Sequence, residues 1–171
     1  NINKIPALNY EWVSHHLAHV TNTIYQSPAT KSLNISFDGG SDEGHFNIYV
    51  TEDRIPTKIY STKQDVCVPY ASVGHYLSPI KQEENWWWGN LTYAGKLMGL
   101  SAYGKVNPDD YSKMTEYFKL QQTDDVNIAH ENFQRIFQVT PGDRFDEERS
   151  YDIAACTQKV FEDIFSEIIT P

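Results

Sequence analysis

Hydrophobic periodicity changes twice along this chain of 171 residues, and no other feature constrains the fold as strongly. Residues 32–38, 46–53 and 54–61 alternate apolar and polar side chains with a period of two, which is typical of half-buried strands. The Gly-rich segment GGSDEG separates the first two runs, and the polar pair Glu52-Asp53 separates the last two. The sequence therefore predicts a three-stranded antiparallel meander.

Helical patterns lie on both sides of this meander. Before it, residues 13–26 place Leu17, Val20 and Ile24 at spacings of three and four, which is the apolar stripe of one helix. After it, we expect helices at residues 71–81, 92–100, 109–120 and 150–168. The mostly polar residues 121–148 are predicted as an excursion over the surface that contains a short apolar island, FQRIF. The predicted fold class is α/β, and residues 1–171 show no sharp internal boundary.

Charge and cysteine content narrow the possible partners and location. Fourteen Lys and Arg residues against 23 Asp and Glu residues give a net charge of −9, so a nucleic-acid partner is not expected. Cys67 and Cys156 form no CxxC pair, which favours neither a disulfide framework nor a cysteine zinc site, and a reducing cytoplasm is the expected location. No run approaches the roughly 18 apolar residues of a membrane span, so no membrane partner is expected.

Two histidines in the first predicted helix have the spacing of a metal-binding pair. His15 and His19 are four residues apart, so their imidazoles project from adjacent turns of one helix face and can meet at one ion. His16 projects about 100° away and is a poorer partner. A pair of this kind also arises by chance or for structural reasons, and a metal site needs a third ligand.

Asp38 is the candidate third ligand because it ends the first predicted strand. Gly39 and Gly40 follow it and leave backbone N–H groups open to phosphate oxygens. The competing interpretation is an ordinary hairpin turn, with Glu43 as a solvated loop charge. Two histidines and one carboxylate suit Fe(II), Mn(II) or Zn(II) without choosing among them.

The segment AGKLMGLSAYGK is a candidate nucleotide-binding element. Gly95 and Gly99 allow a nucleotide close to the backbone, and Lys96 can neutralise a phosphate, although the Walker spacing is absent. The competing interpretation is a tightly packed helix whose small residues face another helix. The nearby residues Trp86–Trp88 and Tyr93 can form an aromatic platform, but packing in the core is the favoured interpretation.

Four motifs occur in an order that resembles the O-carbamoyltransferase family, which includes the nodulation and antibiotic-tailoring carbamoyltransferases. The motifs are HHLAH, ISFDGGSDEG, ASVGHYL and AGKLMGLSAYGK. The resemblance implies a partial actin-like ATPase or ribonuclease-H-like lobe, similar to the tRNA threonylcarbamoyl-transfer protein. It also implies that His15, His19 and Asp38 are metal ligands, with Fe(II) as the favoured ion.

By this resemblance, the chain is an O-carbamoyltransferase. It would use carbamoyl phosphate and ATP, which form a carbamoyl-adenylate, and would transfer the carbamoyl group to the hydroxyl of a small-molecule acceptor. The candidate nucleotide-contacting residues are Gly39, Gly40, Gly95, Lys96 and Gly99. His16 is the nearest candidate for the catalytic base. The alternatives are a threonylcarbamoyl transferase that acts on tRNA adenosine and a non-catalytic nucleotide-binding subunit.

The resemblance covers the central part of a family catalytic domain. Family members carry a preceding segment and later segments that supply a further acidic metal ligand and form the carbamoyl-adenylate. We therefore expect residues 1–171 alone to be inactive and prone to self-association, and to need the other family segments in cis or in trans.

Overall fold

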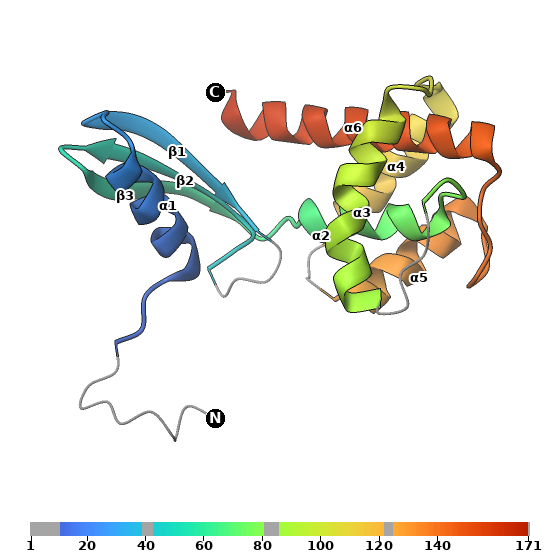
Figure 1. Cartoon of the computed structure of the whole chain (residues 1–171), viewed down its shortest axis with the longest axis horizontal. Coiled ribbons are helices and arrows are strands. Elements are labelled where there is room, and N and C mark those ends of the chain that lie inside the picture. The colour runs from blue at the N-terminus through green and yellow to red at the C-terminus, as the bar shows by residue number, and fades with distance from the viewer. Residues whose placement is uncertain (1–10, 39–42, 81–85, 122–124, 171) are drawn as a thin grey trace. The chain divides into compact units, whose positions relative to one another are not determined.

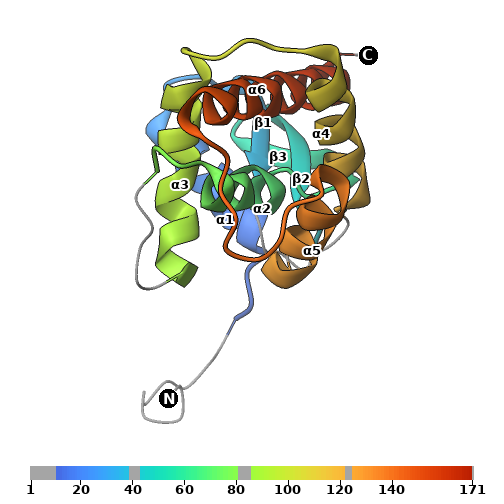
Figure 2. The ribbon, with the colours of Figure 1, turned by 90° about the vertical axis from the view of Figure 1, so that its right-hand side faces the viewer.

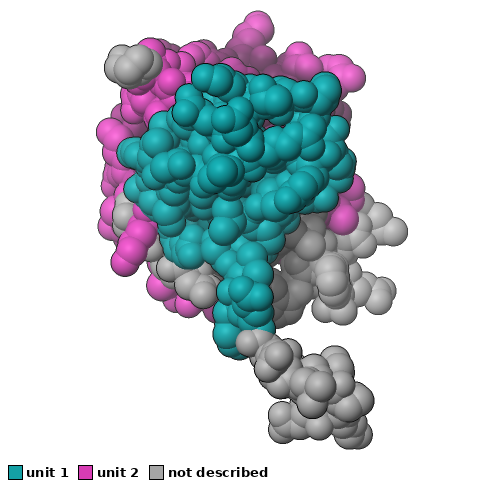
Figure 3. Space-filling view, turned by 90° about the vertical axis from the view of Figure 1, so that its left-hand side faces the viewer, with its two compact units in different colours: residues 1–62 teal, residues 63–171 magenta. Residues whose placement is uncertain are grey.

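The chain divides into two compact units, residues 1–62 and residues 63–171, coloured separately in Figure 3. The computed structural model describes residues 11–38, 43–80, 86–121 and 125–170, and for residues 86–91 it describes the backbone alone. The division falls where the strand periodicity ends and the helical pattern begins, although the sequence shows no linker or other sharp boundary at this point. Among the described residues, no helix combines the length and the apolar character needed to cross a membrane.

The first unit is one helix packed on a three-stranded sheet, as the periodicity predicts (Figure 1). The elements are α1 (His15–Gln26), β1 (Lys31–Phe37), β2 (Phe46–Glu52) and β3 (Ile55–Thr62). The strands are antiparallel in the order β1-β2-β3. Val20 and Ile24 of α1 are buried against Tyr49 of β2, so the predicted apolar stripe holds the helix on the sheet.

Strand register decides which residues lie beneath α1. Ser36 of β1 pairs with Asn47 of β2, and Tyr49 lies two residues further along β2 on the same face. Because Tyr49 contacts the helix, this face lies under α1. The face is polar near the Ser36–Asn47 pair and apolar at Tyr49, and the polar end adjoins the end of β1 where Asp38 follows.

The turn between β2 and β3 lies one residue later than predicted. Glu52 still pairs with Ile55, so Asp53 and Arg54 form the two-residue turn rather than Glu52-Asp53. Both turn residues have positive φ angles, 48° and 66°, as a type I′ hairpin requires. The shift reflects the cross-strand pairing of Glu52, which a polar residue at a strand end does not reveal.

The second unit is helical, and Figure 2 shows its longer helices arranged around α2. The elements are α2 (Cys67–Val73), a 3₁₀ turn η2 (Gly74–Tyr76), α3 (Trp86–Ser101), α4 (Pro108–Leu120), α5 (Val126–Phe137) and α6 (Glu147–Ile169). Asn107 caps α4 by accepting from the backbone N–H of Asp110, and Pro108 occupies the first turn as the sequence predicts.

Helix α5 corrects the expectation that residues 121–148 only cross the surface. Asp125 caps the helix, and Val126, Ala129 and Phe133 are buried at spacings of three and four. Ile136 and Phe137 extend this face against the core, so the apolar positions repeat with a helical period even though polar residues separate them. The apolar island FQRIF is the last turn of this helix.

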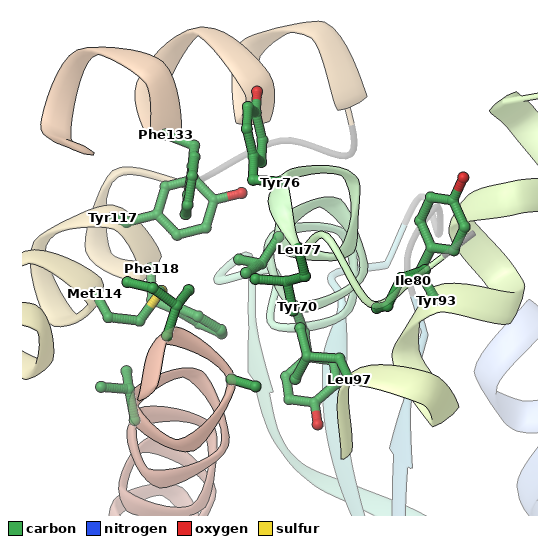
Figure 4. Close-up of a cluster of buried hydrophobic side chains, with 14 of the residues drawn as sticks. Tyr70, Tyr76, Leu77, Ile80, Tyr93, Leu97, Met114, Tyr117, Phe118 and Phe133 are labelled. Atoms are coloured by element: carbon green, nitrogen blue, oxygen red, sulfur yellow. The ribbon is translucent and has the colours of Figure 1, made fainter. Parts of the chain in front are cut away.

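Aromatic residues form much of the second unit's core. Figure 4 shows Tyr76, Tyr117 and Phe133 converging from η2, α4 and α5, and the Tyr76 and Phe133 rings stack with centroids 4.3 Å apart. Gly104 lets the chain after α3 touch α6 directly, because a Cβ atom there would lie 1.9 Å from the backbone oxygen of Tyr151. This part of the unit therefore tolerates no side chain at position 104.

An ion pair joins α4 to α6. Asp110 is completely buried, and both its carboxylate oxygens accept from the guanidinium of Arg149. The amide of Asn107 donates a further hydrogen bond to Asp110 at 2.6 Å. A buried carboxylate stays charged at low cost only while such partners are present.

We expect Arg149→Ala to lower the free energy of unfolding by about 3 kcal/mol, because it leaves the buried Asp110 carboxylate without its countercharge. Urea denaturation followed by circular dichroism measures this loss. Lys113→Ala is the matched control, since it removes an exposed ion pair with Asp109 and should cost less than about 0.5 kcal/mol. Equal losses in the two variants would contradict the assignment.

A histidine of α5 is held neutral by its contacts. Gln134 donates to the Tyr76 hydroxyl oxygen at 3.0 Å, so the hydroxyl proton can point to Nδ1 of His130, also 3.0 Å away. Burial lowers the pKa of His130, and the neighbouring His75 ring, with its centroid 4.7 Å away, adds to the effect, so that together they bring it to about 4. Neutral His130 can therefore accept from Tyr76 at this nitrogen.

Stability should fall as the pH drops from about 6.5 to about 4. In this window His130 takes up a proton in the unfolded chain and not in the folded one, so protons favour unfolding, while above it the contribution is fully present. His130→Leu should flatten the dependence of the unfolding free energy on pH by up to about 1.4 kcal/mol per pH unit. Urea titrations at several pH values measure the slopes, and identical slopes in both proteins would show that His130 titrates normally.

Candidate functional site

Three side chains of the first unit converge at one point beside the sheet. Nε2 of His15 lies 2.9 Å from Oδ2 of Asp38, and Nε2 of His19 lies 3.5 Å from the same oxygen. The two imidazole nitrogens are 3.2 Å apart. The structure thus brings together the three residues that the sequence analysis singled out as candidate metal ligands, with all three ligand atoms within 4.8 Å of one another.

The spacing of these atoms fits the coordination shell of a divalent ion. With metal–ligand bonds of about 2.0–2.1 Å, neighbouring ligand atoms lie about 2.9–3.4 Å apart, which is close to the distances found here. A bound ion would also explain why the Nε2 atoms of His15 and His19 face each other, because both could then direct a lone pair at the same ion. The side chains of His15, His19 and Asp38 are 49%, 58% and 44% exposed, so further ligands have access. Two nitrogens and one oxygen suit first-row divalent metals.

Local structure explains why these side chains meet. Ser14 caps α1 by accepting from the backbone N–H of Leu17, which makes His15 the first helical residue. His19 follows one turn later on the same face. Asp38 comes directly after β1, where its backbone N–H donates to the carbonyl of His45 at 2.9 Å. This bond holds the backbone of Asp38 at the strand end, which is the position that the sequence predicts for its carboxylate.

His16 projects from a different side of α1 than the candidate ligands and is completely buried. Its Nε2 is 2.7 Å from the carbonyl oxygen of Gly44, and its Nδ1 is 2.7 Å from the hydroxyl of Ser36. A carbonyl only accepts, so Nε2 carries the proton and Nδ1 accepts from Ser36. Burial lowers the pKa of His16. These are contacts of a structural histidine, and a role as catalytic base stays a prediction without support from them.

Glu43 and Gly44 hold the end of the connection between β1 and β2 in place, a role that their positions in the sequence do not indicate. The Glu43 carboxylate accepts from Ser14 at 2.7 Å and from Lys58 at 3.2 Å, and both bonds lower its pKa. Gly44 has a φ angle of 96°, and a Cβ atom there would lie 2.7 Å from the Ser61 hydroxyl. Glu43 is therefore part of a contact between α1 and β3 and not merely a solvated charge.

The candidate nucleotide-contacting residues belong to separate parts of the chain. Gly39 and Gly40 lie outside the described residues. Gly95, Lys96 and Gly99 lie on α3 in the second unit, where all three are exposed. Among the described atoms, none lies within 4 Å of a Cβ placed at either glycine, so the packed-helix interpretation does not account for them.

The packing role in this motif belongs instead to Gly104, which touches α6. Tyr93 is fully buried and so belongs to the core, as the favoured interpretation has it, and Nζ of Lys96 lies 5.7 Å from the centroid of its ring. The side chains of Trp86–Trp88 lie outside the described residues.

Comparison with known protein families gives one match. The model described as carbamoyltransferase N-terminus matches residues 2–169, which is nearly the whole chain. No curated protein matches the sequence. The matched range includes both units and every candidate site residue described above.

Proposed function

The chain belongs to the carbamoyltransferase family, and we propose that it carries the metal site and a nucleotide-contacting helix of an O-carbamoyltransferase. The observation that carries the proposal is the convergence of His15, His19 and Asp38 in a member of this family. The family establishes carbamoyl transfer as the general chemistry. The proposal adds the donor, the acceptor class and the residues.

In the proposed reaction, the donor is a carbamoyl-adenylate made from carbamoyl phosphate and ATP. The oxygen of an acceptor hydroxyl forms a bond to the carbamoyl carbon, and the bond from that carbon to the phosphate oxygen breaks. The bonding electrons leave with AMP, and the hydroxyl proton passes to a base or to solvent. The products are the O-carbamoylated acceptor and AMP.

We propose that His15, His19 and Asp38 hold a divalent ion for this reaction, with Fe(II) favoured by the resemblance and Mn(II) or Zn(II) as alternatives. A bound ion would supply Lewis acidity toward phosphate and carbamoyl oxygens. The two imidazole ligands carry no charge and the Asp38 carboxylate carries one negative charge. The three ligands would therefore neutralise one of the two positive charges of the ion. The exposure of the three side chains supports access for a phosphorylated ligand.

We also propose that α3 contacts the nucleotide through Lys96. Its position between Gly95 and Gly99 on an exposed helix face supports this, because the missing side chains leave room for a phosphate beside the ammonium group. We further propose that the helix and meander of residues 15–62 are part of an actin-like lobe. This proposal rests on the motif resemblance and on the antiparallel order β1-β2-β3.

The metal proposal is tested by titrating the chain with Co²⁺ and following its visible absorption. His15→Ala, His19→Ala and Asp38→Asn should each weaken Co²⁺ binding at least about tenfold, because each removes one of three ligands. Asp109→Asn is the matched control, since this carboxylate is exposed on α4, and it should leave the affinity unchanged. Wild-type affinity in all three ligand variants would overturn the proposed centre.

The nucleotide proposal is tested by calorimetry with ATP and a non-reactive carbamoyl-adenylate analogue. Lys96→Ala should weaken binding by about 1–3 kcal/mol, the range for losing a hydrogen bond to a charged group. Lys105→Ala removes another exposed lysine from the same motif and should have no effect. Co²⁺ affinity should be the same in both variants. If ATP binds equally to wild type and Lys96→Ala, α3 is not a nucleotide-contacting helix.

A further inference from the structure

His16 connects the helix that carries two candidate ligands to the strand that leads to the third. Its Nδ1 accepts from Ser36, two residues before Asp38, and its Nε2 donates to Gly44 at the other end of the β1–β2 connection. Both bonds are 2.7 Å long and buried. One rigid ring therefore joins α1 to both sides of the segment that holds Asp38.

The other contacts of α1 restrain it differently. Val20 and Ile24 pack on Tyr49, and such apolar contacts hold the helix close to the sheet without fixing a direction. Ser14 bonds to Glu43, whose side chain is 39% exposed. The bonds of His16 differ from these contacts because they are both buried and directional.

Small rotations of α1 matter because metal coordination tolerates only small changes in the positions of the ligand atoms. Side-chain atoms on a helix lie about 5–6 Å from its axis, so a rotation of about 10° moves them by about 1 Å. Metal–ligand distances hold within about 0.2 Å of their ideal values. His15 and His19 would therefore lose their common point with Asp38 if α1 turned slightly on the sheet.

We propose that His16 is a positioning residue for the metal centre, and that it acts by locking the rotation of α1 relative to Ser36 and Gly44. This inference rests on the proposed function, because it concerns the same three ligands. Ser36 and Gly44 are its partners, and none of the three residues touches the ion.

The test compares Co²⁺ affinity and the visible Co²⁺ spectrum in variants of the full chain. His16→Phe keeps the ring volume and loses both bonds, and it should weaken Co²⁺ binding about 10- to 100-fold and change the absorption bands at saturation. His16→Gln can still donate to the Gly44 carbonyl and should recover most of the affinity and the wild-type bands. This recovery is specific to positioning, because a general loss of packing would not be relieved by a flexible amide.

Ile24→Ala is the matched control for lost stability. It removes packing between α1 and the sheet while leaving His16 and its partners in place, so its unfolding midpoint should fall with no change in Co²⁺ affinity. Equal loss of affinity in Ile24→Ala and His16→Phe would overturn the proposal, and so would wild-type affinity in His16→Phe.

A milder variant covers the case in which His16→Phe does not fold. Ser36→Ala removes the donor to Nδ1 alone and should weaken Co²⁺ binding by less than His16→Phe but measurably, whereas unchanged affinity there would overturn the proposal. A wrong metal site can be told apart from a wrong role for His16. If the metal site is wrong, the wild-type chain binds no Co²⁺ or His15→Ala binds it with wild-type affinity.

Discussion

The packing of α1 on the three-stranded sheet is the interaction on which the candidate site depends. The helix supplies His15 and His19, the sheet supplies Asp38, and neither alone has three ligands. Apolar contacts at Val20 and Ile24 hold the two together, while polar contacts nearer the start of the helix determine how they meet. A nonspecific attraction and a specific alignment are thus provided by different residues of one helix.

Local patterns were sufficient to predict most of the elements. The period-two runs gave the three strands, and the stripe of Leu17, Val20 and Ile24 gave α1, because in both cases burial repeats within a few residues. Helix α5 was not predicted because the polar residues of this segment are typical of a surface excursion, although Val126, Ala129 and Phe133 repeat at helical spacing. The β2–β3 turn was displaced by one residue because its position follows from cross-strand pairing of Glu52, which is a contact between segments.

The candidate ligands could be predicted because their positions depend on local structure, namely one helix turn and one strand end. The four-residue spacing of His15 and His19 and the strand-end position of Asp38 were visible in the sequence, and the structure brings these residues together. The partners of His16 were not visible, because Ser36 and Gly44 lie 20 and 28 residues away and meet it only through the fold. Those distant contacts distinguish a buried structural histidine from a reactive one.

The contact at Gly104 has a mechanical consequence. The chain after α3 meets α6 backbone to backbone at Tyr151, and Lys96 lies eight residues before Gly104, on α3. Contacts between side chains absorb small displacements by changing rotamers, but a backbone contact has no such freedom. At Gly104 there is therefore no side chain that could adjust if α6 moved toward this part of the chain. The close approach thus places α3, which carries the exposed Lys96, against α6 with no room for a side chain between the backbones at this point.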